Sequence, residues 1–128
     1  MLNVFKEWVA PDILVVRLAG RLTLGRNSQE LEWHMEELLS QNQKKVVFDL
    51  SRLTYIDSAG IGIVTVCSGR LKESGGQLRV ACAKGAVQQL LKLTGADRVL
   101  LLHATLQSAL EAFQSASQPG AQPPATPT

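Results

Sequence analysis

The sequence predicts one α/β domain with a mixed sheet of about four strands and about four helices, which lie mainly on one face. Two extended apolar runs open the chain, residues 4–9 and 13–18, and the turn Ala10-Pro11-Asp12 between them predicts a hairpin. Apolar runs then alternate with helical patterns, which is typical of parallel strands joined by helical crossovers. The 128 residues are 45% hydrophobic, enough to bury one core but not two.

The individual elements follow from periodicity. Apolar residues at helical spacing among glutamates predict a first helix over residues 28–40, and the run 46–50 predicts a buried central strand. Residues 53–56 are then expected to form a connection. A second helix should begin at Asp57-Ser58 and stop before Gly75-Gly76, where glycine ends helices.

After that helix, residues 77–82 alternate like a strand, and a third helix is expected to end at Gly95. Residues 99–102 form a further apolar run, and Thr105 is predicted to cap a last helix. The domain is therefore expected over residues 1–114. Residues 115–128 are rich in Pro, Ala, Ser and Thr, so we expect a disordered tail that buries no core.

Composition argues against several classes of function. Thirteen basic and eleven acidic residues are scattered along the chain, which gives no basic cluster for nucleic acid. No apolar run reaches the ~18 residues of a membrane span, so we expect a cytoplasmic protein without membrane contact. Cys67 and Cys82 are expected to be buried free thiols, with no metal site and no cofactor, and Trp8 and Trp33 to pack at the core edge.

The most informative stretch is Asp57-Ser58-Ala59-Gly60-Ile61-Gly62, which follows a strand and opens a helix. Asp and Ser are preferred caps because their oxygens accept hydrogen bonds from unpaired first-turn N–H groups, so the pair could be purely structural. Glycines inside a helix, however, cost about 1 kcal/mol each relative to alanine. Gly60 and Gly62 therefore indicate that a partner, or a tight backbone contact, uses the space that their missing side chains leave.

This segment and the order of elements around it resemble a STAS domain of the anti-sigma factor antagonist family, over about residues 4 to 114. The resemblance implies that an anti-sigma factor, itself a serine kinase, phosphorylates Ser58. It also implies that the unphosphorylated protein binds that anti-sigma factor and frees a sigma factor. Phosphorylation would end the binding, and a serine phosphatase of the metal-dependent type would restore it. The expected partner surface is Arg21, Thr23, Leu24, Gly25, Asp57, Ser58, Ala59, Gly60 and Ile61.

One departure from the family pattern concerns the loop after the second strand. Gly20-Arg21-Leu22 is followed here by Thr23, where the family commonly has an aspartate. A carboxylate near the phosphate acceptor is therefore missing, and kinase recognition is expected to differ or be lost. The alternative within the same fold is a STAS scaffold or docking subunit of another signalling or transport assembly, in which Ser58 is only a helix cap.

We expect no enzymatic activity and no catalytic residues. Ser58, Asp97 and His103 occur in the chain order of an α/β-hydrolase triad. The nucleophile elbow, however, needs glycine two residues before the serine, and Ile56 stands there. The sequence thus favours a protein-binding switch.

Overall fold

The computed structural model describes residues 2–117, apart from the side chains of residues 26–28 and 115–117. The elements follow one another as β1 Leu2–Ala10, β2 Ile13–Leu22, α1 Arg26–Ser40, β3 Lys45–Ile56, α2 Ser58–Glu73, β4 Gln77–Ala81, α3 Gly85–Leu93, the short 3₁₀ helix η1 Ala96–Arg98, β5 Leu101–His103 and α4 Leu106–Ser117. The predicted α/β class is confirmed. The expected tail lies almost wholly outside the described residues.

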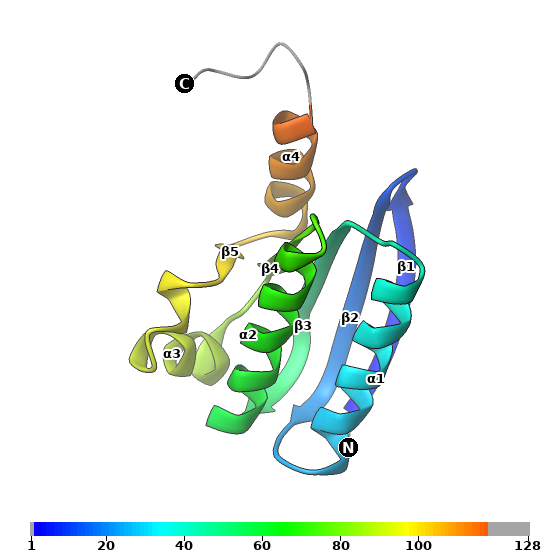
Figure 1. The fold of residues 1–128 in the computed structure, drawn as a ribbon. Helices are drawn as coiled ribbons and strands as arrows, with labels where there is room; N and C mark the ends of the chain where they lie inside the picture. Colours follow the sequence, from blue (N-terminus) through cyan, green and yellow to red (C-terminus); the bar gives the residue numbers. More distant parts are fainter. Residues whose placement is uncertain (1, 118–128) are drawn as a thin grey trace.

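The strands form one sheet in the order β1-β2-β3-β4-β5, with one strand more than predicted (Figure 1). The last strand, β5, overlaps the apolar run noted over residues 99–102, and its three residues pair with β4 from Arg79↔Leu101 to Ala81↔His103. The opening hairpin pairs β1 with β2 antiparallel, and every later neighbour is parallel, as helical crossovers require. The C-terminal ends of β2, β3 and β4 therefore face the same edge of the sheet.

Helices α1, α2 and α3 cover one face of the sheet and α4 covers part of the other (Figure 1). Alternation along β2 and β3 separates the two cores, because neighbouring side chains point to opposite faces. Val16 and Phe48 pack beneath the three helices, whereas Val15 and Val47 pack beneath Phe113 of α4. The prediction of helices mainly on one face is confirmed.

Strand β3 is longer than its apolar run predicts. Residues 53–56, expected to be a connection, remain paired with β2 up to Leu22↔Ile56. Two register shifts make this possible, since β3 uses an additional residue between the pairs Arg17↔Asp49 and Ala19↔Arg52 and another before Arg21↔Tyr55. These bulges hide the strand from a search for strict alternation.

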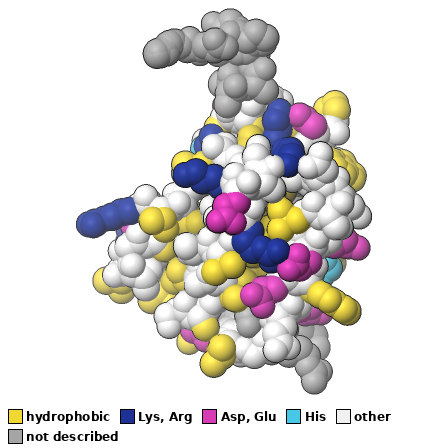
Figure 2. All heavy atoms as spheres, in the orientation of Figure 1, with side chains coloured by type: hydrophobic (Ala, Val, Ile, Leu, Met, Phe, Trp, Pro, Cys, Tyr) yellow, Lys and Arg dark blue, Asp and Glu magenta, His cyan; other side chains and the backbone are white. Residues whose placement is uncertain are grey.

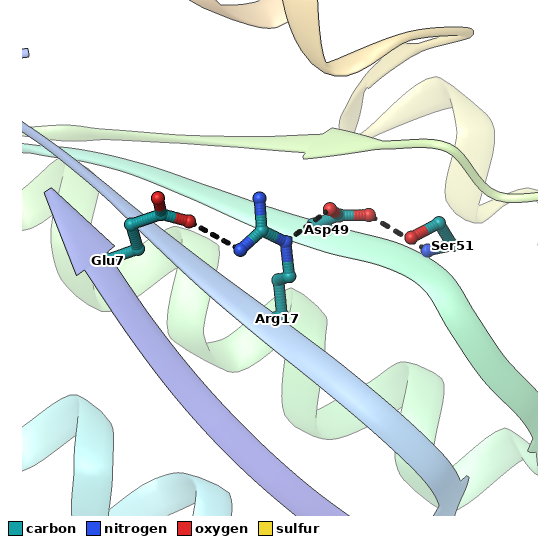
Figure 3. A network of polar contacts seen from close by, with 4 residues as sticks. All are labelled: Glu7, Arg17, Asp49 and Ser51. Carbon is teal, nitrogen blue, oxygen red and sulfur yellow. Dashed lines mark hydrogen bonds and ion pairs between the residues drawn. The ribbon is translucent and has the colours of Figure 1, made fainter. Parts of the chain in front are cut away.

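A buried carboxylate lies on the face that α4 partly covers. Asp49 is 5% exposed, and its Oδ2 accepts a hydrogen bond from Arg17 Nε at 3.1 Å. Its Oδ1 accepts from the Ser51 backbone N–H at 2.9 Å, and Arg17 also pairs with Glu7 on β1 (Figure 3). This chain of contacts links three strands and compensates the desolvation of Asp49.

The two tryptophans and the two cysteines only partly follow the sequence prediction. Trp8 and Trp33 are 58% and 79% exposed, so their expected packing at the core edge is wrong. Cys67 is buried, and burial raises the pKa of its thiol to about 12, whereas Cys82 is half-buried. Among the described residues, no helix is long and apolar enough to cross a membrane.

The contact between α4 and the sheet contains a histidine whose neighbours fix its protonation. His103 Nε2 lies 3.0 Å from Arg79 Nη1, and its Nδ1 lies 2.9 Å from Ser108 Oγ of α4. Because a guanidinium only donates, Nε2 must accept, and the ring is therefore neutral. Burial, and then the charge of Arg79, lower the pKa of His103 below its usual value.

We predict that His103 makes the protein less stable in mild acid. Its folded-state pKa lies below the unfolded value, so its stabilisation is present above about pH 6.5 and is lost as the pH falls below that. In urea melts at about pH 7.5 and pH 5.5, wild type should lose a few tenths of a kcal/mol more than His103→Gln, whose amide can replace both hydrogen bonds. His34 contributes equally to both proteins. Equal losses in the two proteins would contradict the assignment.

Candidate functional site

The site forms where β2 and β3 end side by side. β2 ends at Leu22 and β3 at Ile56, and these two residues are paired in the parallel ladder. Asp57 continues that ladder, since its backbone N–H donates to the Leu22 carbonyl oxygen at 3.3 Å. Such an edge, where parallel strands end and helices begin, is the usual place for binding sites in α/β folds.

The carboxylate of Asp57 joins the two segments that leave this edge. Its Oδ1 accepts a hydrogen bond from the Gly60 backbone N–H at 2.8 Å and so caps α2. Its Oδ2 accepts from the backbone N–H of Leu24 at 3.2 Å, in the loop between β2 and α1. One side chain therefore holds the first turn of α2 against the loop that precedes α1.

Ser58 has no structural hydrogen bond of this kind. It is the first residue of α2, it is exposed, and within the described residues its hydroxyl accepts or donates no hydrogen bond. The interpretation of Ser58 as the helix cap is wrong, because Asp57 already occupies that position. The hydroxyl stands free at the positive end of the helix dipole, where a negative charge is stabilised.

The two glycines of the segment have different explanations. A Cβ on Gly60 would lie 2.4 Å from the Leu22 carbonyl oxygen and 2.9 Å from Ile56 Cγ1, so its missing side chain serves an internal backbone contact. A Cβ on Gly62 would meet nothing within 4 Å. Only Gly62 leaves open surface beside Ser58.

The loop from Arg21 to Gly25 lies beside this helix start, as the sequence predicts. The guanidinium carbon of Arg21 lies 4.3 Å from the centroid of the Tyr55 ring, a cation–π contact that joins the ends of β2 and β3 at the surface. Leu24 is 78% exposed, and Gly25 has φ 113°, a left-handed conformation that suits glycine. Thr23 is half-buried.

The expected surface residues therefore divide into two layers. Arg21, Leu24, Gly25 and Ser58 are exposed, while Gly60 and Ile61 are buried beneath them. Thr23, Asp57 and Ala59 are half-buried between these layers. The buried pair supports the surface from below rather than forming it.

A groove beside Ser58 was not anticipated from the sequence. This α2–α3 groove has a volume of about 430 Å³ and is lined by Tyr55, Ile56, Asp57, Ser58, Ala86, Val87, Gln89, Leu90 and Leu93. Its α3 wall had one detectable signal in the sequence. Val87 and Leu91 are the buried residues of α3 and Leu90 packs partly against the same core, so Leu93 is an additional apolar residue at the surface.

The other candidate residues lie apart from Ser58. His103 is hydrogen-bonded to Arg79 and Ser108 under α4, and neither His103 nor Asp97 lines the α2–α3 groove. The order Ser58, Asp97, His103 therefore assembles no triad at the groove. Within residues 2–117, no group of three or more His, Cys, Asp and Glu side chains is placed to hold a metal ion.

Comparison with known proteins identifies the fold and the relatives of this chain. The family model of the STAS domain matches residues 8–109. The putative anti-sigma factor antagonist BtrV of Bordetella bronchiseptica is 28% identical over 90 residues, covering 70% of this chain and 78% of BtrV.

Solved structures give the same picture of the fold. A putative anti-sigma factor antagonist from Thermotoga maritima superposes with a TM-score of 0.79 at 22% identity, covering 87% of this chain and 94% of its own. The Bacillus antagonist SpoIIAA is known in unphosphorylated and phosphorylated forms. They superpose with TM-scores of 0.67 and 0.66 at 18% and 19% identity, covering 88% and 87% of this chain and 98% and 99% of SpoIIAA.

We predict opposite effects of one methyl group at the two glycines. Gly60→Ala should lower the free energy of unfolding by about 1–3 kcal/mol or more, because the new Cβ overlaps the Leu22 carbonyl. Gly62→Ala should raise it by about 0.5–1 kcal/mol, because alanine favours the exposed helix. Chemical denaturation of both variants checks this. A neutral Gly60→Ala would refute the contact between α2 and the end of β2.

Proposed function

Because the chain belongs to the STAS domain family, we propose that it is an anti-sigma factor antagonist that binds its anti-sigma factor through the edge around Ser58. In the unphosphorylated state it would hold the anti-sigma factor and so free a sigma factor. The anti-sigma factor, acting as a serine kinase, would phosphorylate Ser58 and end the binding. A metal-dependent serine phosphatase would reverse the modification.

The observation that carries this proposal is the free hydroxyl of Ser58. A serine that caps a helix would be explained by its hydrogen bond, but Asp57 caps α2 and leaves Ser58 exposed. The neighbouring side chains on the helix are small, because Ala59 follows Ser58 and Gly62 leaves open surface one turn later. A kinase active site or a docked protein can therefore approach the hydroxyl closely.

The effect of the modification follows from charge. A phosphoserine adds about −1.5 to −2 charge and three acceptor oxygens at the start of α2. The helix dipole stabilises this charge, so the fold should remain intact. A partner that docks on the unphosphorylated surface would meet a bulky dianion next to the Asp57 carboxylate, and binding would weaken. SpoIIAA, a structural relative, is known in a phosphorylated form.

Thr23 favours a second candidate function. The loop offers a hydroxyl where the family commonly has an aspartate, so kinase recognition here has one carboxylate fewer. In this case the chain would be a docking subunit of a larger signalling or transport assembly, with the same surface but without phosphorylation.

We predict a single phosphate on Ser58. Incubation with ATP and candidate anti-sigma factors that carry a serine kinase domain should add one phosphate by intact mass. Ser58→Ala should take none, whereas the matched control Ser68→Ala, on the same helix, should behave as wild type. Ser58→Asp should bind the anti-sigma factor at least about tenfold more weakly, a change of about 1.4 kcal/mol.

Two results would contradict the switch. One is phosphate on another residue that persists in Ser58→Ala. The other is equal affinity of wild type, Ser58→Ala and Ser58→Asp for a partner that binds, which would support the docking subunit instead.

A further inference from the structure

The α2–α3 groove has an apolar wall on α3 that is open to solvent at its rim, where Leu93 lies. Ala86, Leu90 and Leu93 line it at positions i, i+4 and i+7 of α3. Val87, which also lines the groove, and Leu91 are the buried residues of the helix, and Leu90 packs partly against the same core. Leu93 is 83% exposed, and Tyr55 across the groove is 42% exposed. An apolar stripe at helical spacing beside an open groove suits a helix laid along it.

One charged side chain lines this groove, Asp57, whose carboxylate already accepts two backbone hydrogen bonds, and two lysines flank the groove outside its lining. Lys84 immediately precedes α3, and Lys92 lies three residues after the groove residue Gln89, one helical turn along. Both lysines are exposed, and neither makes an ion pair with a described residue. Helix α3 has no acidic residue and no capping side chain.

The opposite flank of α2 has the reverse charge. Helix α1 carries Glu30, Glu32, Glu36 and Glu37 and lies on the other side of α2 from α3 (Figure 1). The space-filling view shows hydrophobic side chains gathered at the lower left, over α3 and the start of α2 (Figure 2). Charges of both signs alternate in the centre of that view. Between the two helices, Arg70 of α2 pairs with Glu36 of α1. The groove thus combines an apolar wall with unpaired lysines.

The N-termini of two helices add to the positive electrostatic potential of the lysines. α2 follows β3 and α3 follows β4, and these strands are parallel neighbours, so both helices begin near the same edge of the sheet. The positive ends of both helix dipoles therefore lie near Ser58 and Lys84. An acidic segment placed in the groove would meet these dipoles and both lysines together.

We propose that the α2–α3 groove binds an acidic amphipathic helix of the partner protein, and that a phosphate on Ser58 competes with its carboxylates for the same positive field. The apolar face of the helix packs on Leu90 and Leu93, and its carboxylates lie near Lys84 and Lys92. Only the phosphate competition rests on the proposed function. The groove and its charges exist whether or not a kinase acts.

The test uses the full chain and two synthetic helical peptides of about 18 residues. Both peptides have the same leucine face, and all remaining positions are Glu in one peptide and Lys in the other. NMR of the ¹⁵N-labelled protein should show the Glu peptide shifting the amides of Ser58, Gln89, Leu90 and Leu93. The Lys peptide should leave them unchanged. Equal binding of both peptides, shifts confined to α1, or binding of neither would overturn the proposal.

Matched variants separate charge from a general effect on the fold. Lys92→Glu should lower the affinity for the Glu peptide by about fivefold or more, because it reverses a charge beside the groove. Lys72→Glu makes the same change in the last turn of α2, away from the groove, and should alter affinity by less than about twofold. Equal losses in the two variants would overturn the assignment of the site.

The competition is tested by a double-mutant cycle. Introduced into the wild-type protein, Ser58→Asp should lower the affinity for the Glu peptide by about threefold to fivefold. Introduced into the Lys84→Glu variant, it should lower that affinity by less. Additive effects would contradict a shared field. These measurements need no kinase, so a failure of Ser58 phosphorylation would be visible separately as the absence of the added phosphate.

Discussion

The site depends on the carboxylate of Asp57, whose two oxygens accept hydrogen bonds from two different segments of the chain. Oδ1 caps α2 through the Gly60 N–H, and Oδ2 holds the loop before α1 through the Leu24 N–H. A carboxylate can do both because it accepts hydrogen bonds at two oxygens, whereas a serine or threonine cap has a single oxygen. The surface around Ser58 therefore consists of segments from two parts of the chain, held in a fixed relation by one residue. Ser58, relieved of the capping role, is available for another protein.

The same edge is assembled by backbone packing beneath that carboxylate. Gly60 lets the first turn of α2 approach the Leu22 carbonyl at the end of β2, and Ile61 is buried just after it. The interior thus brings the loop, the helix start and the end of β3 together, while the exposed Leu24, Ser58 and Gly62 remain outside. Next to them, the apolar wall of α3 and its lysines extend the surface. The residues that stabilise this edge are buried, and the residues available to a partner are their exposed neighbours.

The sequence predicted the class of the fold, the hairpin, the helices and the position of Ser58, because each depends on local patterns. It did not predict that β3 runs to Ile56, since two bulges break the alternation there. It could not assign the cap to Asp57 rather than Ser58, because both are good caps and only geometry separates them. Gly60 and Gly62 look alike in the sequence, and only the Leu22 carbonyl distinguishes them. The groove was missed because its residues come from strand end, helix start and α3, which are distant along the chain.

Amide hydrogen exchange of Asp57→Asn tests most directly whether one carboxylate joins the helix and the loop. Asparagine is an equally good N-cap, so its carbonyl should keep the bond from the Gly60 N–H. Its NH₂ group cannot accept from the Leu24 N–H, so that bond is lost. Protection of the Leu24 amide should therefore fall by about tenfold, while that of Gly60 stays within about twofold of wild type. Unchanged protection at Leu24 would show that the Asp57 carboxylate does not hold the loop.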